Sequence, residues 1–115
     1  SRPSSALPAD DGVNAIRPAG SITELQVTGR GNVAAGATTV LLNVAAVSPA
    51  AKGYLTVYPC DAARPTSSNV NYVAGGNRAN LVLVKVPTSG PKAGKVCIFT
   101  SQQTNLIADV MGQVT

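Results

Sequence analysis

The chain has 115 residues, a net charge of +4 at pH 7 and a pI near 9.4. This length is enough for one domain with its own core and too short for two, and a hydrophobic content of 44% excludes a disordered chain. The nine Lys and Arg residues are scattered and no apolar run reaches the length of a membrane span, so we expect neither nucleic-acid binding nor membrane insertion.

The first segment, residues 1–20, is rich in Pro, Ser, Ala and Asp. Pro3, Pro8 and Pro18 would each interrupt a ladder of strand hydrogen bonds, since proline has no N–H to donate. We therefore interpret residues 1–20 as an N-terminal arm or linker and residues 21–115 as a single domain.

After residue 20, short apolar runs alternate with turn residues. In the strongest run, residues 39–48, both faces are largely apolar, which predicts a central strand. The predicted strands are residues 21–29, 39–48, 54–60, 69–73, 81–86, 96–100 and 105–114. About seven strands at this spacing, without helical periodicity, predict an all-β fold: an antiparallel two-sheet β-sandwich of jelly-roll or immunoglobulin-like character.

The two cysteines lie in two of these predicted strands. Cys60 ends the run that begins at Tyr54, and Cys97 lies in the run that contains Phe99. Two such cysteines in a small β domain predict one disulfide, which places the protein in an oxidising, extracellular compartment; the alternative is a cytosolic chain with two buried free thiols. Closing a loop of roughly 36 residues would stabilise the fold by about 3–4 kcal/mol. We expect no metal and no cofactor, because the chain has no His and two thiols do not complete a zinc site.

Several motifs resemble those of a β-rich repeat module found in secreted proteins of actinobacteria. They are Gln26-Val27-Thr28-Gly29-Arg30-Gly31, Val40-Leu41-Leu42-Asn43-Val44, Gly53-Tyr54-Leu55-Thr56-Val57-Tyr58-Pro59-Cys60, Arg64-Pro65, Ser68-Asn69-Val70-Asn71-Tyr72, Lys95-Val96-Cys97-Ile98-Phe99 and Asn105-Leu106-Ile107-Ala108-Asp109-Val110. The resemblance covers roughly residues 21–112. It implies secretion, a β fold and a frequent position beside hydrolase domains, while the role of the module is unassigned.

The chain departs from this module at its N-terminus. Members often carry a Leu-Asp-Thr-Arg-like segment before the first strand, and residues 1–18 show no clear equivalent. The first strand of the module would therefore be missing, replaced or differently paired in this chain.

The residues that catalysis needs are scarce. Without His, neither a Ser-His-Asp nor a Cys-His arrangement can form, and oxidised cysteines offer no thiol nucleophile. The available carboxylates are Asp10, Asp11, Glu24, Asp61 and Asp109. Nothing in the sequence brings two of them together across a cleft, as a glycosidase requires. We therefore expect no enzymatic activity.

Asp109 stands among apolar residues, between Ile107 and Met111 on one strand face. A buried carboxylate must be paired or hydrogen-bonded, because burying a bare charge is very costly. We predict a structural ion pair between Asp109 and an arginine, with Arg64 as the first choice and Arg30 or Arg78 as alternatives.

Phenol and amide side chains gather in the middle of the chain, and sugars are bound by aromatic faces together with planar polar groups. The predicted ligand-binding residues are Tyr54, Tyr58, Asn69, Asn71, Tyr72, Asn77, Arg78 and Asn80. The alternative is that the tyrosines pack within the fold and the asparagines shape turns.

The function that we favour from sequence is a non-catalytic, secreted accessory or adhesion module that binds polysaccharide or cell-wall glycan, with a possible linked hydrolase domain. One alternative is a small secreted protease inhibitor acting through an exposed loop, residues 87–94 or 101–104. The other is a structural spacer or assembly domain, in which the arm at residues 1–20 adds a strand to a neighbour.

Overall fold

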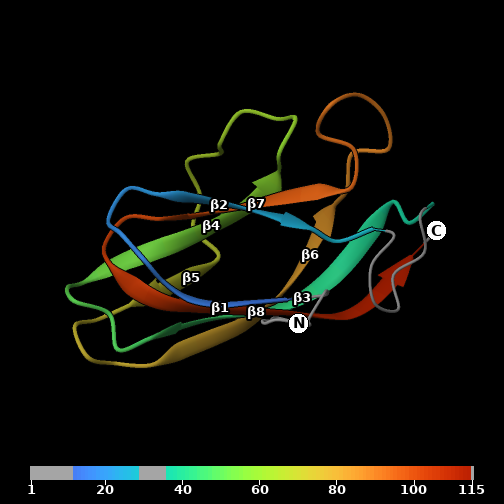
Figure 1. The fold of residues 1–115 in the computed structure, drawn as a ribbon. Coiled ribbons are helices and arrows are strands. Elements are labelled where there is room, and N and C mark those ends of the chain that lie inside the picture. Colours follow the sequence, from blue (N-terminus) through green and yellow to red (C-terminus); the bar gives the residue numbers. More distant parts are fainter. Residues whose placement is uncertain (1–11, 29–35, 115) are drawn as a thin grey trace, which may run out of the picture.

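The computed structural model describes residues 12–28 and 36–114, and most of them lie in β-strands (Figure 1). The strands are β1 (Gly12–Arg17), β2 (Ile22–Gln26), β3 (Thr39–Val47), β4 (Gly53–Pro59), β5 (Val70–Tyr72), β6 (Arg78–Lys85), β7 (Lys95–Thr100) and β8 (Thr104–Val114). Across these two described ranges there is no helix long and apolar enough to cross a membrane.

The strands form two antiparallel sheets that lie face to face, as Figure 1 shows. Sheet I has the order β1-β8-β3-β6, and sheet II has the order β2-β7-β4-β5. Apart from the step from β4 to β5, consecutive strands lie in opposite sheets. This is the strand order of a jelly roll. The predicted two-sheet sandwich is therefore confirmed, with jelly-roll rather than immunoglobulin-like topology.

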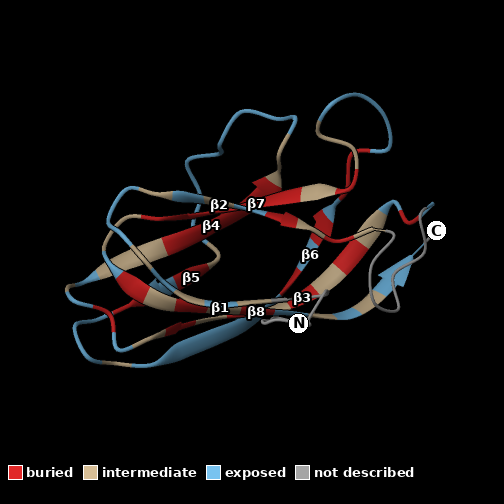
Figure 2. Ribbon diagram, in the orientation of Figure 1, coloured by how far each residue is buried: buried red, intermediate tan, exposed pale blue. Residues whose placement is uncertain are grey.

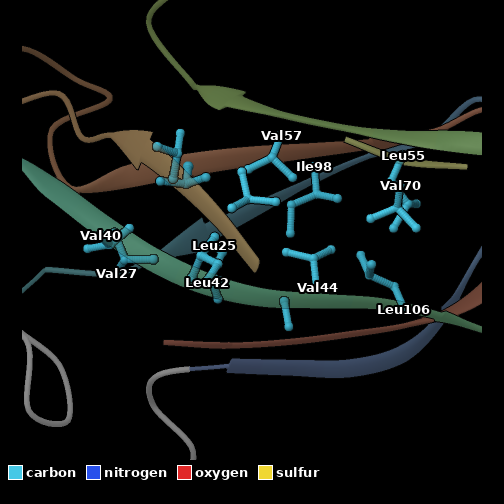
Figure 3. Close-up of a cluster of buried hydrophobic side chains, with 14 of the residues drawn as sticks. Leu25, Val27, Val40, Leu42, Val44, Leu55, Val57, Val70, Ile98 and Leu106 are labelled. Atoms are coloured by element: carbon cyan, nitrogen blue, oxygen red, sulfur yellow. The ribbon is translucent and has the colours of Figure 1, made fainter. Parts of the chain in front are cut away.

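The core fills the space between the sheets and is almost entirely aliphatic (Figure 3). On β3 the side chains of Val40, Leu42, Val44 and Ala46 are all buried, as the alternation in the sequence predicts. β3 lies between β8 and β6, so its predicted central position is confirmed. Figure 2 shows the buried positions concentrated on the strands where the two layers face each other. Each fully buried Val or Leu side chain contributes about 1.5–3 kcal/mol by leaving water.

Strand β1 corrects the predicted domain boundary. Residues 12–17 pair with β8 over six positions, from Gly12 opposite Asp109 to Arg17 opposite Thr104. The prediction of an arm over residues 1–20 is therefore wrong for this part, because β1 is an edge strand of sheet I and Pro18 follows its last pair. The rest of the predicted arm, residues 1–11, lies outside the described residues.

Asp109 also corrects a prediction, since its side chain is exposed. On β8 the neighbouring Leu106 and Ala108 point into the core, so the alternation directs Asp109 to the outer face of sheet I, where water hydrates the carboxylate. Arg64 lies elsewhere: its guanidinium is over the ring of Phe99, in sheet II. The predicted Asp109–Arg64 ion pair is therefore wrong.

The connection from β6 to β7 ends in a glycine that the fold requires. Gly94 has φ +78°, a conformation that L side chains rarely adopt, and its carbonyl accepts a hydrogen bond from the N–H of Val27 at 2.7 Å. A Cβ built at Gly94 would overlap Thr28 Oγ1 and Gln26 Nε2. Gly90, in the same connection, has φ +83° and open space around it.

Comparing these two glycines separates the effect of steric overlap from the effect of a positive φ. We predict that Gly90→Ala lowers the free energy of unfolding by about 1–2 kcal/mol, the cost of a positive φ alone. Gly94→Ala adds a steric overlap and should cost at least about 1 kcal/mol more. Urea denaturation of both variants measures the difference, and equal losses would contradict the steric argument.

Candidate functional site on the outer face of sheet II

The outer face of sheet II carries a second, aromatic cluster. On β4 and β7, Leu55, Val57, Val96 and Ile98 point into the core, so the residues between them point outward. Tyr58, Cys97 and Phe99 are buried in this cluster, and Tyr54 and Cys60 pack against them. Most of the aromatic rings of the chain therefore lie outside the main core.

The connection from β4 to β5 covers this cluster. Figure 1 shows residues 61–68 running above β4 and β7, on the side away from sheet I, and Figure 2 shows that this connection is exposed. The guanidinium carbon of Arg64 lies 3.8 Å from the ring centroid of Phe99, within the range of a cation–π contact. Thr56 Oγ1 donates a hydrogen bond to the carbonyl of Ser67 at 2.8 Å. These two contacts hold the connection against the sheet.

The disulfide fixes where this connection starts. Cys60 and Cys97 are joined, with their Cα atoms 5.0 Å apart, which confirms the predicted bond. Cys60 follows directly after β4, and Cys97 lies in the middle of β7 opposite Tyr58. The bond therefore ties the beginning of residues 61–68 to the neighbouring strand.

Glu24 lies beside the disulfide and is paired with two lysines. Its carboxylate accepts a hydrogen bond from Lys92 and lies 3.6 Å from Lys95 Nζ. The hydrogen bond from Lys92, helped by the charges of both lysines, holds the pKa of Glu24 below its usual value. A carboxylate oxygen of Glu24 and the sulfurs of Cys60 and Cys97 lie within 4.8 Å of one another. Because both sulfurs are in the disulfide, this group offers no thiolate to a metal ion.

Beside the covered rings lies a polar and aromatic surface. The half-buried ring of Tyr54 is tilted against Phe99 with centroids 5.8 Å apart. Asn71 is opposite Tyr54 in the β4–β5 pairing, is exposed, and accepts a hydrogen bond from Ser68 Oγ at 3.0 Å. Ile22 is opposite Phe99 on β2 and is 47% exposed. We call this surface the Tyr54 patch; it consists of Ile22, Tyr54, Arg64 and Asn71.

Only two of the eight predicted ligand residues, Tyr54 and Asn71, lie in this patch. Tyr58 and Tyr72 are buried and present no ring face to solvent. The Tyr72 hydroxyl is 2.7 Å from Thr100 Oγ1 and accepts a hydrogen bond from the N–H of Gln102 at 3.0 Å. Tyr72 therefore anchors the turn between β7 and β8 rather than a ligand.

Three of the predicted asparagines hold the backbone of the fold. Asn69 Oδ1 accepts a hydrogen bond from the N–H of Val57 at 2.7 Å, and Asn77 Oδ1 accepts one from the N–H of Ser48 at 2.9 Å. Asn80 Nδ2 donates to the carbonyl of Asn69 at 3.0 Å, which links β6 to the segment before β5. The amide groups at these positions are engaged in hydrogen bonds within the fold.

The predicted ligand residue Arg78 lies outside the patch, at the start of β6 in sheet I. Its Nη1 donates a hydrogen bond to the carbonyl of Asn77 at 3.1 Å. Phe99 and Ile22 were not among the predicted site residues, and Arg64 was predicted in another role. Alternation along β7 was the available signal, because buried Val96 and Ile98 place Phe99 outward on the same face as Tyr54.

The loop at residues 87–94, the first candidate for protease inhibition, is folded into turns. The N–H of Gly94 donates to the carbonyl of Pro87 at 2.8 Å, and the N–H of Ala93 donates to the carbonyl of Gly90 at 3.1 Å. The turn at residues 101–104 is tied to Tyr72 through Gln102. Neither loop presents a free extended strand, and neither favours inhibition over the patch.

Comparison of the chain with protein-family models, with curated proteins and with solved structures finds no significant match. Inference of function therefore rests on the geometry of the Tyr54 patch.

The disulfide gives a prediction for stability. Replacing both cysteines, Cys60→Ala with Cys97→Ala, should lower the free energy of unfolding by about 3–4 kcal/mol, because the unfolded chain loses its cross-link. Urea denaturation of the variant and of the wild type with dithiothreitol should give the same lowered midpoint. A double variant as stable as the oxidised wild type would contradict the prediction.

Proposed function

We propose that this chain is a non-catalytic, secreted accessory module that binds polysaccharide or cell-wall glycan through the Tyr54 patch. The observation that carries the proposal is the placement of Tyr54, Arg64 and Asn71 around Phe99 on the outside of a sheet. A sugar ring offers C–H groups to a π face and hydroxyls to fixed donors and acceptors. A phenol ring beside an amide and a guanidinium supplies both within one shallow surface.

The rigidity of the patch supports the same proposal. The disulfide, the Arg64–Phe99 contact and the Thr56–Ser67 hydrogen bond hold the 61–68 connection in place. A pre-ordered surface loses less conformational entropy when it binds, which matters where few contacts are made. A patch on the outer face of a sheet suits the side of a long polymer better than a small enclosed substrate.

Export supports the choice of ligand. A disulfide in a small all-β domain is compatible with an extracellular location, where polysaccharides and cell-wall polymers are the abundant surfaces. The resemblance to secreted actinobacterial modules points to the same setting. We propose that the module targets a linked or neighbouring hydrolase to such a polymer, with modest affinity that repeated copies would raise.

Binding is tested by sedimenting the pure protein with insoluble polysaccharides, including peptidoglycan sacculi, chitin and cellulose. Tyr54→Leu keeps apolar packing against Phe99 and removes the ring, so retention should fall about tenfold. Asn71→Ala should weaken retention as well, because it removes the exposed amide.

The matched control is Asn14→Ala, an exposed strand asparagine on the outer face of sheet I. It should leave retention unchanged. The proposal fails if no polysaccharide retains the wild type above background, or if Asn14→Ala and Asn71→Ala lose retention equally.

A further inference from the structure

The outer face of sheet I carries an exposed apolar patch. Leu81 and Leu83 on β6 are 57% and 68% exposed, and Leu41, opposite Leu83 on β3, is half-buried. Figure 2 shows the first half of β6 as exposed along its length. Along the same sheet, Ile16 and Val114 are also large and more than half exposed. No described element covers this face, whereas the outer face of sheet II has the 61–68 connection across it.

The sequence of β3 indicates that this face is built to be covered. A strand with one solvated face normally alternates apolar and polar residues, but three of the five positions of β3 outside its buried ones are apolar, namely Leu41, Ala45 and Val47, and the other two are Thr39 and Asn43. Isolated apolar residues on a surface are ordinary, whereas a contiguous patch on neighbouring strands marks an interaction site. The chemistry of the rest of the face indicates which partner fits.

The charges on this face are self-complementary. Among the described residues that point outward from sheet I, only Asp109 and Lys85 are charged, and their charges are opposite. Asp109 on β8 is opposite Asn43, and Lys85 on β6 is opposite Thr39. Leu41 lies on β3 midway between Asn43 and Thr39. The line from the acid to the base therefore crosses the apolar patch at its centre.

We propose that two copies of this chain associate through the outer faces of sheet I, around a two-fold axis that passes through Leu41. A rotation that exchanges the positions of Asp109 and Lys85 brings Lys85 of each copy against Asp109 of the other. Leu41 packs on Leu41 of the second copy, and Leu81 and Leu83 close over the patch from both sides. This is an isologous interface, in which one surface serves both copies.

The second copy fits the patch better than a charged partner. The chain as a whole carries +4, but the outward charges of this face cancel, so two copies do not repel each other where they meet. The long dimensions of the molecule are 38 and 35 Å, so one broad face has room for the roughly 800 Å² per partner that a specific interface buries. The inference does not depend on the proposed glycan binding.

The first measurement is sedimentation equilibrium of the wild type up to about 1 mM, which would detect even a weak dimer. We expect a monomer–dimer equilibrium. Leu83→Gln should raise the dissociation constant at least about tenfold, because it places an amide in the apolar contact. Leu83 is exposed in the single copy, so this variant should fold normally. Val73→Gln, at an exposed valine outside sheet I, is the matched control and should leave the equilibrium unchanged.

Charge exchange tests the geometry itself. Lys85→Asp and Asp109→Lys should each raise the dissociation constant about tenfold or more, since both contacts become like-charge pairs. Mixed in equal amounts, the two variants should form a heterodimer, because each contact then joins an acidic side chain of one variant to a basic side chain of the other. The variant that carries both substitutions should dimerise like the wild type.

Either of two results would overturn the proposal. One is a wild type that stays monomeric at the highest concentration, in which case another part of the parent protein or a different partner covers the face. The other is a dimer that Leu83→Gln or the charge exchange does not weaken, which would place the interface elsewhere.

Discussion

The structure depends on one constraint: along each strand, alternate side chains must enter a single aliphatic core between two sheets. On β3 and β8 the buried residues are small or branched aliphatics such as Val44, Leu106 and Ala108. They fill the narrow space between sheets without the bulk of a Trp or a central Phe. Side chains alternate between the two faces of a strand, so when these residues point inward, the residues next to them must point outward. The chemistry of both outer faces follows from the packing of the inner ones.

The two outer faces meet this constraint in different ways. Sheet II turns most of its aromatic residues outward and covers them with its own chain, using the disulfide, Arg64 over Phe99 and the Thr56–Ser67 hydrogen bond. Sheet I turns leucines outward and has no such cover among the described residues. The outer face of sheet II therefore has covered aromatic rings with polar side chains beside them, which suits a ligand. The outer face of sheet I has apolar side chains that no described element covers, which suits contact with another protein surface.

Much of the fold could be predicted from local pattern. The alternation of Val40, Leu42 and Val44 identified β3, and the position of Cys60 and Cys97 in two apolar runs identified the disulfide. The local pattern does not predict β1, because prolines stand before and after it in the sequence. An edge strand tolerates such neighbours, since it needs hydrogen bonds to one side only.

The site was harder to predict, because strand order decides which side chains meet. Tyr54 and Phe99 come together because β4 pairs with β7, a contact between residues far apart in the chain. Asp109 was misjudged for a related reason: apolar neighbours on its own strand suggested burial, but they belong to a face that is itself exposed. Whether a strand residue is buried depends on what packs against that face of the sheet, and the sequence of the strand alone does not show this.

The positions of the two faces also bear on how the module would act as a dimer. The faces are back to back, so association through sheet I leaves both Tyr54 patches directed outward, on opposite sides of the dimer. Such a dimer could not place both patches on one flat polymer surface, and it would gain no avidity there. It would instead hold two polymer strands, one on each side. Two of the proposed glycan sites in this arrangement would make a cross-link, whereas tandem copies joined end to end along one chain would make a stronger anchor.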